Sequence, residues 1–207
     1  MLGTALDKGF SLVWSIMKVN FYFILFTLMG GIVLGIGPAF QTATDLLVEF
    51  ESNWKALTFR RAFDYWRTNF KVGNRNFWLY AAVAFAFGYN LYLAIQIKKL
   101  VFFAIGFVLI FCLVLASVIY LYVTLYTSEY EVRFRGILKL ALTSTFLNFA
   151  SFFKLLFGIF GIFVVSWNMK GLFIFGTFAM LAYWSVISTK PIRNLVAHKL
   201  TGEKLMN

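Results

Sequence analysis

Residues 100–128 read LVFFAIGFVLIFCLVLASVIYLYVTLYTS and contain no charged side chain. A helix needs about 20 consecutive apolar residues to cross the hydrocarbon core of a bilayer, so this stretch predicts a membrane-spanning helix. The bias extends to the whole chain of 207 residues, which is 61% apolar and 13% charged, against about 45–50% and 25% in soluble domains. These values exclude a soluble enzyme, a DNA-binding domain and a disordered protein. They predict an all-α, polytopic helical bundle that forms one integral membrane domain over residues 1–207.

Other uncharged runs surround this stretch, at 19–44, 76–97, 140–153, 155–169 and 171–189. Runs 76–97 and 171–189 are long enough to span. Run 19–44 is interrupted by glycine and by Pro38. It is therefore either one kinked span or a hairpin whose returning helix covers about 38–52. These alternatives give five or six membrane helices and place the N-terminus on opposite sides.

Lys154 interrupts the apolar segment 140–169. One straight helix would hold this lysine near the middle of the bilayer, at a cost of about 3 kcal/mol or more. We therefore predict that residues 133–152 lie along the membrane interface and that about 153–169 span. Lys154 would then extend its ammonium group to the lipid headgroups.

Residues 54–75 form the most strongly amphipathic segment. Aromatic residues recur at helical spacing on one face, and the other face carries the basic residues Arg60, Arg61, Arg67 and Lys71. Such a helix is expected to lie in the interface on its aromatic face, or to pack that face on other parts of the protein. Segments 4–18 and 133–152 precede apolar runs in a similar way. This weak pattern suggests three pseudo-repeats of an interfacial helix followed by a helical hairpin.

The chain carries 19 Lys and Arg against 8 Asp and Glu, a net charge of +11. In a membrane protein such an excess collects in cytoplasmic segments and lies against anionic lipid, so nucleic acid is not an expected partner. Ten of the basic residues lie in 54–75 and 190–207. We therefore expect 54–75, 129–139 and the C-terminal tail 190–207 to be cytoplasmic, in a multi-pass protein of the cell membrane.

Residues for catalysis are sparse. The single histidine, His198, has no ligand partner at metal-binding spacing, and the single cysteine, Cys112, lies in an apolar stretch. A phosphate-binding loop of the Gly-x-x-x-x-Gly-Lys-Ser/Thr type is missing from the sequence. The clear spans contain no acidic residue that could couple transport to ions. We therefore expect a protein that is not an enzyme and binds neither cofactor nor metal.

Two small-residue pairs indicate close helix packing, Gly31-x-x-x-Gly35 and Ala84-x-x-x-Gly88. They would pack helices within the chain or hold a partner subunit. Asn90 is the best candidate for a polar site at mid-membrane, although amides in spans more often bond a neighbouring helix.

Residues 30–78 carry a family resemblance. A Gly-x-x-Pro-Ala turn, formed by Gly35, Pro38 and Ala39, ends an aromatic-rich first span, and a basic segment containing the Asn69-Phe70 pair leads into the second. This resembles the YesL family of bacterial membrane proteins, a family of unknown function found mainly in Gram-positive bacteria. Chain length and order of spans agree with that family, whereas the acidic stretch 45–51 departs from it.

The resemblance implies a function through gene neighbourhood, because members are often encoded beside carbohydrate ABC importers and glycan-degrading enzymes. It implies no catalytic or binding residue. The leading expectation is a non-catalytic accessory subunit that binds the permease domains of a sugar importer. The alternative is an independent small-solute carrier or channel, which would need a polar cavity.

Overall fold

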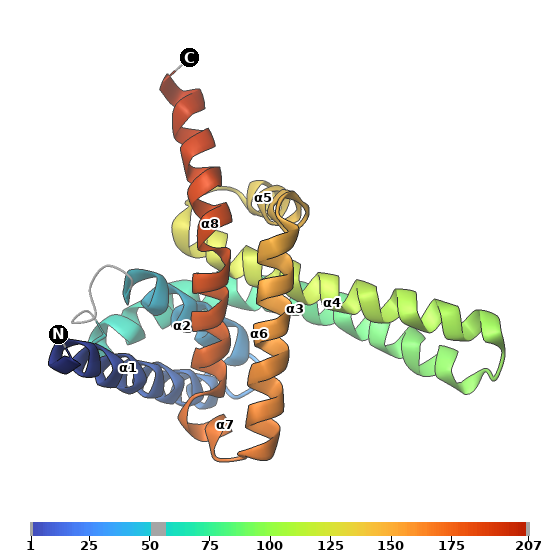
Figure 1. Cartoon of the computed structure of the whole chain (residues 1–207), viewed down its shortest axis with the longest axis horizontal. Helices are drawn as coiled ribbons and strands as arrows, with labels where there is room; N and C mark the ends of the chain where they lie inside the picture. The colour runs from blue at the N-terminus through green and yellow to red at the C-terminus, as the bar shows by residue number, and fades with distance from the viewer. Residues whose placement is uncertain (1, 51–56, 206–207) are drawn as a thin grey trace.

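The computed structural model describes the backbone of residues 2–50 and 57–205, and the side chains of residues 9–49 and 57–199. Eight helices, and no strand, occur in these ranges. The chain is an all-α polytopic helical bundle (Figure 1).

Helices α1 (Leu2–Met29) and α2 (Ile36–Phe50) form a hairpin. Between them the backbone takes positive φ angles at Gly31 and Ile32, +72° and +64°, and the Ile32 N–H donates to the Thr27 carbonyl at 2.8 Å. The hairpin alternative for run 19–44 therefore describes the structure, and the single kinked helix does not. With 15 residues, α2 is about 22 Å long, which is too short for a full crossing.

Helix α3 (Phe59–Gln96) is continuous over 38 residues. The sequence predicted a separate interfacial helix at 54–75, of which 54–56 lie outside the described residues; instead, the amphipathic segment is the first half of the long helix. Its aromatic face packs on α1: the ring centroids of Trp66 and Phe26 lie 5.6 Å apart, and those of Phe63 and Phe26 6.4 Å apart. Of the two alternatives, the aromatic face therefore packs on another helix of the protein.

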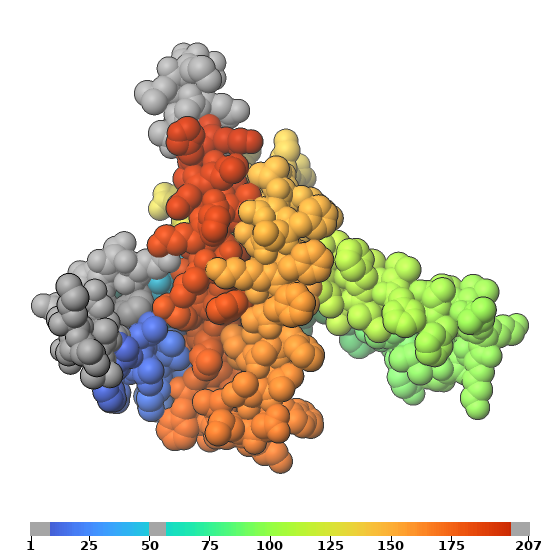
Figure 2. Space-filling view, viewed as in Figure 1, coloured from blue at the N-terminus to red at the C-terminus, as the bar shows by residue number. Residues whose placement is uncertain are grey.

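Helix α4 (Leu100–Glu129) returns beside α3 after a short link at 97–99. The two helices form a long hairpin whose linked ends project away from the other helices (Figures 1 and 2). We call the part of this hairpin formed by residues 84–114 the arm. Elsewhere, α6 and α8 run side by side, across the direction of α1 and of the arm (Figure 1).

Helices α5 (Phe134–Leu147) and α6 (Phe149–Asn168) meet at Asn148, whose side chain accepts a hydrogen bond from the Ser151 N–H at 3.2 Å. The predicted division of this segment is present, with its break at Asn148 rather than after residue 152. Lys154 is exposed in the second turn of α6.

Helices α7 (Leu172–Phe175) and α8 (Thr177–Leu205) share the run that was predicted to span at 171–189. The break at Gly176 leaves α8 only 13 uncharged residues before Lys190. Among the described residues, four helical segments are long and apolar enough to cross a membrane, Gly9–Met29, Phe59–Gln96, Leu100–Glu129 and Phe149–Asn168. This is fewer than the five or six predicted.

In the described residues, the three predicted pseudo-repeats do not each begin with a separate interfacial helix. Helices α1 and α3 each run through the amphipathic segment into the apolar run without a break. Only α5 is separate from the apolar helix that follows it. The main apolar core lies instead where α1, α2, α4 and α8 meet, and includes Phe26, Leu46, Tyr122 and Val186.

Candidate functional site

Two glycines bring α2 against α3. A Cβ atom at Gly37 would lie 2.6 Å from the Gly73 carbonyl oxygen, and one at Gly73 would lie 2.6 Å from the Pro38 Cα. Real Cβ atoms do not approach backbone this closely, so only glycine fits at either position. The close crossing places the polar face of α2 beside α3 and the C-terminal end of α4.

Asp45 is the centre of the polar cluster formed there, which consists of Gln41, Asp45, Asn69, Thr124 and Ser128. Its carboxylate accepts hydrogen bonds from Gln41 Nε2 at 3.0 Å, from Asn69 Nδ2 and from Ser128 Oγ. Gln41 Nε2 also lies 3.0 Å from the Thr124 carbonyl oxygen and 3.0 Å from Ser128 Oγ. The cluster therefore ties α2, α3 and α4 together through one carboxyl group.

The protonation of Asp45 reflects opposing influences. Burial raises the pKa of this carboxyl above its usual value, while the hydrogen bonds from Ser128, Gln41 and Asn69 lower the pKa and the charge of Glu49 raises it further. Burial has the largest effect on the pKa, and it raises the pKa because it penalises the charged form. Asp45 lies on α2, outside the four candidate spanning helices.

Two ion pairs flank this polar cluster. Glu49 pairs with Arg61 and accepts a hydrogen bond from the Tyr65 hydroxyl at 3.3 Å. Glu129 pairs with Arg193 of α8, whose side chain is only 5% exposed. The Arg193 guanidinium also donates to the Val186 carbonyl at 2.8 Å. Removing one member of such a buried pair would leave the other charge uncompensated.

Asn20 makes a second polar contact between distant parts of the chain. Its Oδ1 atom accepts from the N–H groups of Phe178 and Ala179, at 3.0 and 3.2 Å, and its Nδ2 atom donates to the carbonyls of Phe173 and Ile174, at 3.2 and 2.6 Å. The fully buried side chain thus fastens α1 to the junction of α7 and α8. This is a structural role.

The two predicted small-residue pairs lie in different kinds of structure, one in a turn and one on a helix. Gly31 and Gly35 lie in the turn between α1 and α2 rather than on a helix face; a Cβ at Gly35 would lie 2.2 Å from the Thr27 carbonyl oxygen. The turn of Gly35, Pro38 and Ala39 leads into α2, where Ala39 is fully buried. In the arm, Ala84 and Gly88 are half-buried, and no atom lies within 4 Å of a Cβ placed at Gly88.

The predicted polar residues are exposed. Asn90 donates to the Ala86 carbonyl of its own helix at 2.8 Å, and so makes no contact across helices by that bond. On α3, the basic residues Arg60, Arg61, Arg67 and Lys71 remain outside the packed face. Arg61 forms the ion pair with Glu49 that flanks the polar cluster.

The role of Asp45 was not predicted, because this acid lies just beyond the uncharged run 19–44 and outside the clear apolar spans. A signal was present: Gln41, Thr44 and Asp45 follow one another at helical spacing on a segment that also carries apolar residues. Asn69 was noted only for its resemblance to a family pattern, and its contact with Asp45 was not foreseen. Among the described residues, no group of three or more His, Cys, Asp and Glu could hold a metal ion.

A protein-family model described as "Protein of unknown function, DUF624" matches residues 16–91. The matched region contains the second half of α1, all of α2 and most of α3, including its part in the arm up to residue 91, and with them Gly37, Asp45, Asn69 and Gly73. Neither a curated protein nor a solved structure matches the chain significantly. The chain is therefore similar, over its first membrane hairpin and the helix that crosses it, to a family without an assigned function.

Proposed function

We propose that this protein is a non-catalytic accessory subunit, located in the cell membrane with a cytoplasmic C-terminus, that binds the permease domains of a carbohydrate ABC importer. The identity of the partner comes from the resemblance to the YesL family. The DUF624 match at 16–91 includes residues 30–78, which carry that resemblance. The basic segments provide the argument for orientation.

The observation that carries the binding proposal is the arm. It consists of two long apolar helices that project beyond the helices of the main core (Figure 2). Gly88 lies on it with no close neighbour around its Cβ position, so a partner helix can approach the backbone there. Aromatic side chains beside it, Phe85, Tyr89 and Tyr92, are exposed and would supply contact area.

Co-purification tests this proposal. The protein, expressed with the permease subunits of a carbohydrate ABC importer from the same genome, should be recovered in a stable complex with them after detergent extraction. Gly88→Leu should reduce recovery of the complex by at least tenfold. Gly161→Leu is the matched control, because Gly161 also lies on a long apolar helix with nothing within 4 Å of its Cβ position. Equal recovery from both variants would exclude the arm as the binding surface, and absence of any complex would reject the accessory function.

The Asp45 cluster favours a second candidate, an independent carrier coupled to protons. Asp45 is a buried carboxyl held between α2, α3 and α4 by hydrogen bonds from Gln41, Asn69 and Ser128, and a carboxyl at such a junction of helices could bind and release a proton during transport. Purified protein in liposomes should then accumulate a sugar in response to a pH gradient, and Asp45→Asn should abolish this uptake. If wild-type liposomes show no uptake above empty ones, the carrier function is rejected.

A further inference from the structure

The tip of the arm carries an isolated pair of positive charges. Lys98 and Lys99 are the only charged residues between Arg75 and Glu129, and they occupy the link between α3 and α4. Both are exposed. The N-terminal end of α4 begins immediately after them, and its helix dipole adds further positive potential at the same place.

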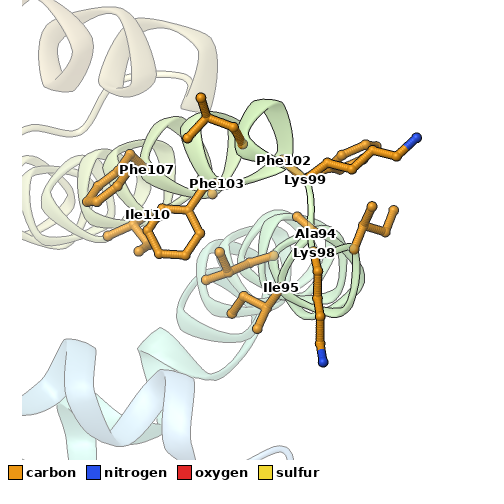
Figure 3. Close-up of a pocket in the computed structure, with 12 residues that line it drawn as sticks. Ala94, Ile95, Lys98, Lys99, Phe102, Phe103, Phe107 and Ile110 are labelled. Carbon is orange, nitrogen blue, oxygen red and sulfur yellow. The ribbon is translucent and has the colours of Figure 1, made fainter.

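A groove opens directly below these lysines. Its volume is about 540 Å³, and it is lined from α3 by Leu91, Ala94 and Ile95 and from α4 by Phe103, Phe107 and Ile110. This volume lies within the range of roughly 300–1,000 Å³ that is usual for ligand sites. Figure 3 shows apolar side chains from both helices along the groove, with the ammonium groups of Lys98 and Lys99 at its end pointing away from it in different directions. The groove is thus apolar along its length and cationic at one end.

The length of α3 would allow the groove to lie beside the lipid headgroups. The uncharged part of α3, residues 76–97, is about 33 Å long as a helix, close to the thickness of the hydrocarbon core. If Arg75 lies at one interface, Lys98 and Lys99 reach the other, where lipid phosphates are found. The groove then runs from the headgroup region into the hydrocarbon.

We propose that the tip of the arm binds one anionic phospholipid, with an acyl chain in the groove and the phosphate between Lys98 and Lys99. Charge complementarity selects this occupant: no carboxylate lies on the arm to neutralise the lysines, and their long stems can turn toward a phosphate at the rim. A zwitterionic lipid would fill the groove equally well but would gain less from the two cations. The inference is independent of any protein partner.

Lipid binding can be measured on the purified full-length chain by native mass spectrometry and by the shift in melting temperature. The probes are phosphatidylglycerol and phosphatidylcholine with identical acyl chains. Phosphatidylglycerol should bind about tenfold more tightly. Lys98→Gln combined with Lys99→Gln should remove this preference, whereas Lys154→Gln combined with Lys170→Gln, which neutralises two other exposed lysines, should leave it unchanged.

The groove is tested separately from the charges. Gly106→Leu would fill space beside Leu91, whose Cδ1 lies 3.6 Å from the Cβ position of residue 106, and should weaken phosphatidylglycerol binding about tenfold with both lysines intact. Phe103→Ala, at a side chain 72% exposed, is a second groove variant that should keep the fold and weaken binding in the same direction. The proposal is overturned if both groove variants bind normally, if the Lys98/Lys99 variant retains the preference, or if the Lys154/Lys170 control loses it equally. Equal stabilisation by glycerol 3-phosphate alone would also overturn it, because the acyl chain would then be unnecessary.

Discussion

Asp45 accepts hydrogen bonds from residues on three helices, and its removal should therefore destabilise the fold. We expect Asp45→Ala to lower the free energy of unfolding by about 2 kcal/mol at neutral pH, because buried donors of Gln41, Asn69 and Ser128 lose an acceptor. Asp64→Ala is the control, since Asp64 is exposed on α3, and should change stability by less than about 0.5 kcal/mol. Denaturant unfolding in detergent measures both; equal effects would show that the cluster adds no stability.

The raised pKa of Asp45 predicts how stability changes with pH. The folded protein keeps the Asp45 proton to a higher pH than the unfolded chain does, so between the ordinary carboxyl pKa, about 3.9, and the raised value the folded state binds more protons. Stability from this group is present below that interval and is lost as pH rises through it. Asp45→Asn should remove this loss. The stability difference between wild type and Asp45→Asn, measured at each pH, follows the titration of Asp45, and a difference that is constant with pH would contradict the prediction.

For single residues, the sequence predicted which side chains are exposed better than it predicted which side chains contact one another. The exposure of Arg60 and Lys71 follows from amphipathic spacing, which is a local property. Asp45 and Asn69 are 24 positions apart, and their contact depends on how α2 crosses α3. Periodicity within one helix does not contain that information.

The crossing of α2 and α3 makes a prediction about whole elements. Gly73→Ala should lower the free energy of unfolding by about 1–3 kcal/mol, because the new methyl group would overlap the backbone at Pro38 and force the helices apart. Gly161→Ala is the matched control on α6, where the methyl group meets no atom within 4 Å. It should be neutral or stabilising by up to about 1 kcal/mol, because alanine favours helix.

Thermal melting of both glycine variants, followed by circular dichroism in the same detergent, distinguishes packing from propensity. If Gly73→Ala melts at or above the wild-type temperature, the close approach of α2 and α3 is wrong. A parallel loss in Gly161→Ala would instead show that helix packing on α6 is tighter than described.

The sequence predicted the presence of helices more accurately than the residues at which they begin and end. The apolar run at 100–128 became α4, and the segment around Lys154 divided as expected. The amphipathic segment at 54–75 did not end before the following span: no proline separates the polar and apolar halves, and the helix continues through Gly73. In contrast, Gly176 stopped the run at 171–189 early, and a single glycine within an apolar run is a weak signal in a sequence.

For the whole molecule, composition alone predicted an all-α polytopic bundle, and this is confirmed. Among the described residues four helices are long and apolar enough to span, against the five or six expected, because the turn at Gly31 leaves α2 short and the break at Gly176 shortens α8. The projection of the arm could not be predicted from the sequence. It arises because α3 and α4 are longer than the helices that pack against their other halves.

The arm also makes a prediction about membrane topology. The basic first half of α3 should be cytoplasmic, because its cations resist translocation, and the single apolar crossing at 76–97 should bring Lys98 to the outer side. In a Cys112→Ala background, Thr68→Cys and Lys199→Cys should resist a membrane-impermeant thiol reagent in intact cells, whereas Lys98→Cys should react. All three side chains are exposed on the protein, so all three should react after the membrane is opened with detergent. Labelling of Thr68→Cys in intact cells would reverse the orientation, and protection of Lys98→Cys with labelling after detergent would mean that the arm does not cross the bilayer.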